Sequence, residues 1–154
     1  EKGQGATFRI YLPASTKTAQ KEENPPGSLK KGQEAVLIVD DEKMNIAVTT
    51  DMLEALGYRV ISATSGQEAI YRYNEMKDEI CVVILDMVMP GMGGEETFDT
   101  LKEINPDIKV ILSSGYSLDG QAKVIMSRGC KAFIQKPFSL NNLSQKLRQV
   151  LDEA

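Results

Sequence analysis

The stretch Ile80-Cys81-Val82-Val83-Ile84-Leu85-Asp86 is an apolar run that stops at a carboxylate. A run of Val, Ile and Leu this short is typical of a strand that is buried on both faces of a sheet. Four further runs of similar length occur along the chain, each followed by a polar or helical segment. The strands that we predict span residues 35–39, 59–63, 82–85, 109–112 and 132–134.

Amphipathic segments separate these runs and favour helices. The helices that we predict span residues 44–56, 68–76, 95–104, 121–127 and 139–151. Gly57 and Gly129 follow two of them, where glycine commonly ends a helix. Alternating strands and helices predict an α/β fold, a doubly wound five-stranded parallel sheet with five helices. In such a sheet the ligand site lies beyond the carboxyl ends of the strands.

The composition fits one globular domain with extra segments as tails or linkers. The 154 residues are 42% hydrophobic and 26% charged. A formal net charge of -4 gives no electrostatic footprint for nucleic acid, so we expect no nucleic-acid partner. The longest apolar run is far shorter than the roughly 20 residues that cross a bilayer. We therefore expect a cytoplasmic segment that makes no membrane contact.

The chain contains no histidine, which removes histidine-activated nucleophiles and the usual zinc sites. Cys81 and Cys130 have no CxxC spacing, and we interpret both as buried, reduced thiols. Any chemistry must therefore use carboxylates, hydroxyls and lysine.

Carboxylates follow two of the predicted strands. The strand at 35–39 runs directly into Asp40 and Asp41, and the strand at 82–85 runs into Asp86. Such an oxygen-rich cluster suits a hard divalent cation, and Mg²⁺ is the cofactor that we predict. The alternative is that Asp40 and Asp41 only cap the following helix, and for this pair alone capping is favoured.

Two further strand ends carry complementary groups. The fourth strand is followed by Ser113-Ser114, and the fifth by Lys136-Pro137, so a hydroxyl and an ammonium group reach the same rim. An aspartate can accept a phosphoryl group when a metal masks its charge, and a lysine with a hydroxyl can bind the phosphoryl oxygens. The strand ends together therefore favour phosphoryl transfer.

From Val36 to Leu151, about three quarters of its length, the chain resembles the receiver domain of response regulators and hybrid histidine kinases. The family has a flavodoxin-like fold with an acidic pair, an acceptor aspartate, a Thr or Ser and a Lys-Pro at successive strand ends. Asp40-Asp41, Asp86, Ser114 and Lys136-Pro137 fill these positions in order. Ser114 stands where threonine is more frequent in the family.

The resemblance implies that Asp86 is the phosphoacceptor and that Asp41 is a direct magnesium ligand. It implies a water-mediated role for Asp40 and a ligand oxygen from the backbone carbonyl of Val88. The implied phosphoryl donor is a phosphohistidine on a histidine kinase or phosphotransfer protein.

The same resemblance implies that Ser114 and Lys136 bind phosphoryl oxygens, and that Phe133 and Ser114 form the conformational switch. The alternative for Phe133 is an ordinary core position. Methionines in the loop after the acceptor are interpreted as packing material without a role in the site. They are Met87, Met89 and Met92.

Two other functions fit part of this pattern. A Mg²⁺-dependent phosphohydrolase also uses an acceptor aspartate, but such enzymes carry a second acid two residues later, where this chain has Val88. A docking receiver that is never phosphorylated would lack one of the acidic, hydroxyl or lysine groups, and none is missing here.

The N-terminal segment Gly3 to Pro13 resembles the closing strand of the ATP-binding domain of sensor histidine kinases. We expect a kinase remnant at 1–13, a linker at 14–32 and the receiver at 33–154, with no ATP site in this chain. The alternative is an unrelated β-prone tail. A lone strand at Thr7 to Leu12 would expose unpaired backbone groups and favour self-association.

Overall fold

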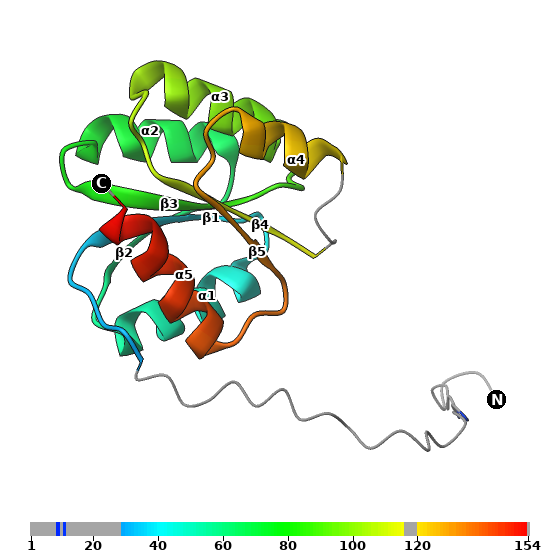
Figure 1. Ribbon diagram of the computed structural model, residues 1–154. Helices are drawn as coiled ribbons and strands as arrows, with labels where there is room; N and C mark the ends of the chain where they lie inside the picture. The colour runs from blue at the N-terminus through cyan, green and yellow to red at the C-terminus, as the bar shows by residue number, and fades with distance from the viewer. Residues whose placement is uncertain (1–8, 10, 12–28, 116–119, 154) are drawn as a thin grey trace.

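The protein is described by a computed structural model, which covers residues 9, 11, 29–115 and 120–153 (Figure 1). The strands are β1 (Ala35–Val39), β2 (Arg59–Ala63), β3 (Ile80–Asp86), β4 (Val110–Ser114) and β5 (Ala132–Gln135). The helices are α1 (Lys43–Ala55), α2 (Gly66–Met76), α3 (Gly94–Ile104), α4 (Gly120–Ser127) and α5 (Leu140–Asp152). All strand pairs are parallel, in the order β2-β1-β3-β4-β5, which confirms the predicted fold.

Helices cover both faces of the sheet, with α1 and α5 on one face and α2, α3 and α4 on the other (Figure 1). Successive residues of β1 alternate between the two cores. Leu37 and Val39 pack towards α2 and α3, whereas Val36 and Ile38 pack towards α1 and α5. A strand with apolar residues on both sides needs this double layer, because its side chains point alternately to opposite faces.

Burial is complete only in the middle of the sheet. Every residue of β1 and β4 is buried, as the apolar runs predict. In contrast, β2 is an edge strand, and only Ala63 of its five residues is buried. The expectation of burial on both faces is therefore wrong for β2, because an edge strand has a neighbour on one side only.

The two cysteines differ in burial. Cys130 is buried, as predicted, but the prediction for Cys81 is wrong because Cys81 is exposed. The register explains this difference. Ala35 pairs with Ile80 and Val36 pairs with Val82, so Cys81 is an extra residue at an irregularity in the ladder. Such a bulge residue is left unpaired, and its side chain does not follow the alternation of the strand.

The turn after α1 ends the helix as the sequence predicts. Gly57 has a positive φ of 93°, its N–H donates to Glu54 O at 2.9 Å, and the N–H of Tyr58 donates to Leu53 O at 3.0 Å. This pair of bonds satisfies the last carbonyl groups of the helix and needs a left-handed residue, which glycine adopts without steric cost.

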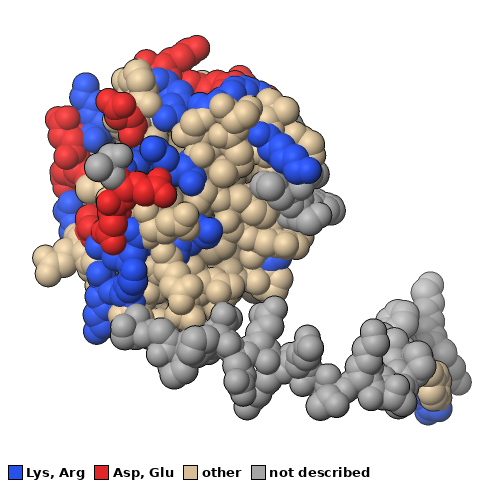
Figure 2. Space-filling view, in the orientation of Figure 1, with Lys and Arg blue, Asp and Glu red and all other residues tan. Residues whose placement is uncertain are grey.

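Most of the N-terminal predictions lie outside the described residues, namely the strand at 7–12 and most of the linker at 14–32. Among the residues that are described, no helix is long and apolar enough to cross a membrane. On the face drawn in Figure 2, acidic and basic side chains are interspersed rather than separated into continuous areas.

Candidate functional site

The sheet brings three aspartates together at its carboxyl edge. Asp40 follows β1 and Asp86 ends β3, and these strands are neighbours in the sheet. One carboxylate oxygen from each of Asp40, Asp41 and Asp86 lies within 4.8 Å of the others. Asp40 and Asp86 are only 4% and 7% exposed, so these charges have lost most of their hydration. The cluster that the sequence predicts is therefore formed.

Lys136 is the basic group of this site. Its Nζ lies 2.5 Å from Asp40 Oδ2 and 3.1 Å from Asp86 Oδ2. Its backbone N–H donates to the carbonyl oxygen of Ser114 at 2.8 Å, which ties the segment after β5 to the end of β4. The Lys136-Pro137 peptide bond is cis. We call Asp40, Asp41, Asp86 and Lys136 the acidic pocket.

The charges of the acidic pocket do not balance. Three carboxylates and one ammonium group leave a formal charge of -2 in a largely buried space. Burial raises the pKa of Asp86, and the charge of Lys136 offsets only part of this effect. Burial also opposes the charge on Lys136, but its contacts with Asp40 and Asp86 outweigh it and raise the pKa of the ammonium group. A divalent cation would remove the remaining imbalance.

The helix-capping alternative for the acidic pair does not describe Asp40. The N-cap of α1 is Glu42, whose side chain makes no capping hydrogen bond. Asp40 Oδ1 instead accepts from the backbone N–H of Glu42 at 2.9 Å and from Asn45 Nδ2 at 3.2 Å. Asn45 thus orients the carboxylate of Asp40, a role that sequence patterns did not reveal because asparagine in a first helical turn has many other uses.

The other predicted site residues lie in β4, in the loop after β3 and in β5. Ser114 is the buried last residue of β4. Val88 exposes 62% of its surface, and its backbone lowers the pKa of Asp86 slightly, against the larger effect of burial. Phe133 lies in β5, partly buried, and packs against the core under α2, α3 and α4.

The loop after Asp86 is held by packing. Met89 is buried in the core and Met87 packs against it, which confirms the packing interpretation for these two methionines. A Cβ added to Gly94 would lie 2.4 Å from the carbonyl oxygen of Asp86. The start of α3 therefore needs glycine in order to pack against the end of β3.

An apolar cavity of about 450 Å³ opens beside Lys136, between α1 and the segment that leads to α5. Two of its lining residues, Met44 and Val48, are exposed to 77% and 50%. Its lining consists of Met44, Asn45, Val48, Thr49, Met52, Gly115, Lys136, Pro137 and Phe138. Apolar surface thus lies directly beside the charged pocket.

Known proteins are similar to this chain in sequence and in fold. The model of the response regulator receiver domain matches residues 36–148. The sensor kinase CckA of Brucella abortus is 33% identical over 162 aligned positions, which cover 99% of this chain but only 17% of that protein. The chemotaxis protein CheY of Thermotoga maritima is 34% identical, over 75% of this chain and 95% of CheY.

Solved structures agree with these matches. In the CheX-CheY complex of Borrelia burgdorferi with BeF3 and Mg²⁺, a chain superposes with a TM-score of 0.72 and 30% identity, covering 76% of this chain and 88% of that one. With the acidic pocket at the expected edge of the same fold, the chain belongs to the response regulator receiver domain family and is a receiver domain of two-component phosphorelay signalling.

Proposed function

We propose that Asp86 accepts a phosphoryl group from a phosphohistidine, with Mg²⁺ bound in the acidic pocket. The observation that carries this proposal is the set of three carboxylates, two of them buried, and one lysine, with a formal charge of -2. Such a set repels an incoming phosphoryl group unless a cation offsets it. The pocket therefore fits a metal-assisted acceptor better than a purely structural ion pair.

In the proposed transfer, an oxygen of the Asp86 carboxylate attacks phosphorus, the bond between phosphorus and the histidine nitrogen breaks, and the imidazole leaves as a neutral ring after taking a proton. Asp41 would bind the metal directly, Asp40 through water, and the Val88 carbonyl would supply another oxygen. The bound Mg²⁺ supplies charge neutralisation between acceptor and donor.

Lys136 and Ser114 would bind the other phosphoryl oxygens. Lys136 already contacts the acceptor, with its Nζ 3.1 Å from Asp86 Oδ2, so a short movement would bring it to a new phosphoryl group. A phosphoryl group adds nearly two negative charges at neutral pH, enough to bias a two-state element. We propose that Phe133 and Ser114 form that element, because both lie on the strands next to the pocket.

The apolar cavity beside Lys136 supports a protein as the phosphodonor. Exposed apolar side chains such as Met44 and Val48 favour contact with the apolar face of a partner helix. A donor helix seated there would present its phosphohistidine to Asp86. Substituting Met44 and Val48 with Asp should slow transfer from a phosphorylated protein but not from acetyl phosphate.

We also propose that the chain comes from a cytoplasmic part of a hybrid histidine kinase. The alignment with CckA covers 99% of this chain, so it includes the segment that precedes the receiver. This coverage supports the interpretation of residues 1–13 as a kinase remnant, 14–32 as a linker and 33–154 as the receiver.

Intact-mass measurement after incubation with Mg²⁺ and acetyl phosphate tests the acceptor. The wild-type chain should gain one phosphoryl group and Asp86→Asn none, whereas Ser114→Ala should still gain it, more slowly. Equal labelling of Asp86→Asn would overturn the assignment. Sustained release of phosphate from p-nitrophenyl phosphate would favour the phosphohydrolase instead.

A further inference from the structure

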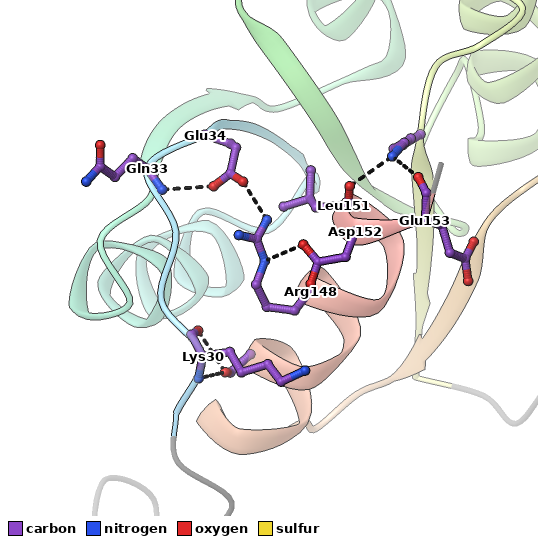
Figure 3. Close-up of polar contacts among 9 residues, drawn as sticks. Lys30, Gln33, Glu34, Arg148, Leu151, Asp152 and Glu153 are labelled. Carbon is purple, nitrogen blue, oxygen red and sulfur yellow. Dashed lines mark hydrogen bonds and ion pairs between the residues drawn. The ribbon is translucent and has the colours of Figure 1, made fainter.

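Residues Leu29 to Glu34 precede β1 and lie at the edge of the sheet opposite the acidic pocket. We call this segment the strap. Its Lys30 is held by one side chain of α5 (Figure 3): the backbone N–H of Lys30 donates to Ser144 Oγ at 2.7 Å, and the Ser144 hydroxyl donates to the carbonyl of Lys30 at 2.9 Å. Ser144 is fully buried. One hydroxyl therefore satisfies both backbone groups of a residue that has no regular secondary structure.

The middle of the strap contacts the end of α1. The N–H of Gly32 donates to Leu56 O at 3.1 Å. A Cβ on Gly32 would lie 2.2 Å from the ring of Tyr58 and 2.4 Å from Glu34 Oε2. The backbone thus lies flat against the tyrosine, and a larger side chain at position 32 would displace the strap.

Arg148 of α5 binds the other end of the strap, at Glu34 (Figure 3). Its Nη2 lies 2.5 Å from Glu34 Oε1, its guanidinium group lies 5.7 Å from the centre of the Tyr58 ring, and only 13% of its side chain is exposed. Ser144 and Arg148 are four residues apart and therefore share one face of α5. This face binds the strap at Lys30 and again at Glu34.

The C-terminus of α5, the helix that makes these contacts, is held by hydrogen bonds from Lys109. Lys109 Nζ donates to Leu151 O at 3.0 Å and to Glu153 O at 2.6 Å (Figure 3). A lysine at a helix C-terminus satisfies carbonyl groups that have no partner within the helix. The strap is therefore held by a fixed surface.

We propose that the strap is a docking device by which the receiver holds its own incoming chain against α5 and α1. The upstream segment then leaves from a fixed point at the edge of the sheet opposite Asp86. The five residues of β1 separate that point from the acidic pocket by about 17 Å. If Asp86 is the acceptor, as proposed above, this placement keeps the attached chain away from the face that the donor must reach.

Amide hydrogen exchange by NMR on the full chain tests the strap independently of phosphorylation. In the wild type the amides of Lys30 and Gly32 should be protected. Ser144→Ala should accelerate exchange at Lys30 by roughly tenfold, the size of one lost buried hydrogen bond. Exchange at Leu37 in β1 should not change in this variant. The control Gln149→Ala, at an exposed position of α5, should leave the amides of Lys30 and Gly32 protected.

The proposal is overturned if the Lys30 amide exchanges in the wild type as fast as an unprotected amide, or if Ser144→Ala has no effect on it. If Ser144→Ala accelerates Lys30 and Leu37 equally, the change is global, and Glu34→Gln becomes the deciding variant. Glu34→Gln must then accelerate exchange at the amide of Gly32 without accelerating exchange at Leu37. If it does not, the strap does not open separately from the rest of the domain.

Discussion

Carboxylates meet a basic side chain at both edges of the sheet, the one at the carboxyl ends of the strands and the one at their amino ends. The balance of charge differs between the two edges. In the acidic pocket, Lys136 faces three carboxylates, two of them buried. At the strap, Arg148 faces Glu34 in a direct pair, with the exposed Asp152 at 3.8 Å. Excess buried charge of one sign indicates a ligand that completes the site, whereas a direct pair needs none.

The pKa values of Asp86 and Glu34 shift in opposite directions. Burial raises the pKa of Asp86, despite the opposing charge of Lys136. Burial acts in the same direction on Glu34, but its hydrogen bonds, led by the bond from Arg148, outweigh it and lower the pKa of that carboxyl group. The charged form of Asp86 is thus disfavoured, and that of Glu34 is favoured.

The largest expected difference between the edges is in metal affinity. Asp41→Asn should weaken Mg²⁺ binding by about 100-fold, because a direct ligand is lost, and Asp40→Asn by about tenfold, as is typical of groups that act through a ligand or water. Glu34→Gln, at the opposite edge, should leave the affinity unchanged. Isothermal titration with Mg²⁺ measures all three. Equal losses for the two aspartates would reject the ranking.

The next effect concerns stability at the strap. Arg148→Met keeps the aliphatic packing but leaves Glu34 without its partner, and we expect the free energy of unfolding to fall by about 1–2 kcal/mol. The matched control is Arg59→Met, which breaks a pair with Glu79 whose side chains are 61% and 51% exposed. That change should cost no more than about 0.5 kcal/mol. Urea unfolding would contradict the account if both variants lost the same amount.

The smallest effect is the pH dependence, which should have opposite signs at the two edges. The pKa of Glu34 is lower in the folded protein than in the unfolded chain. Its ionised carboxylate therefore stabilises the fold above the unfolded pKa, and this stability is lost as the pH falls through the folded pKa. The pKa of Asp86 is higher in the folded protein than in the unfolded chain. Its protonated form therefore contributes stability below the unfolded pKa, and this stability is lost as the pH rises through the folded pKa. In Mg²⁺-free buffer at pH 7, Glu34→Gln should therefore be less stable than wild type and Asp86→Asn more stable. Each difference should shrink as the pH falls through the folded pKa of its group, and differences of the same sign at pH 7 would contradict this comparison.

The acidic pocket was predictable because its parts follow the strands in the sequence. Asp40 and Asp86 come directly after apolar runs, and parallel strands bring such residues to one edge. The helix boundaries also agree within about two residues. These features depend on local patterns, which the sequence displays directly.

The strap was not predictable from the same patterns. Ser144 and Lys30 are 114 positions apart, as are Arg148 and Glu34, and no periodicity links them. Polar residues before a strand are typical of a linker, so sequence patterns predict a linker up to Gly32. Asn45 and the bulge at Cys81 escaped prediction for the same reason, because tertiary contacts and strand register determine their roles.

The dependence of Asp86 phosphorylation on Mg²⁺ tests the central claim most directly. The wild-type chain is incubated with acetyl phosphate over a range of Mg²⁺ concentrations and in EDTA, and the labelled fraction is followed by intact mass. If the excess negative charge of the pocket must be offset before a phosphoryl group can approach, the rate should rise with Mg²⁺ and saturate at the affinity that calorimetry gives, with no labelling in EDTA. Labelling of Asp86 in EDTA at the same rate would contradict the account.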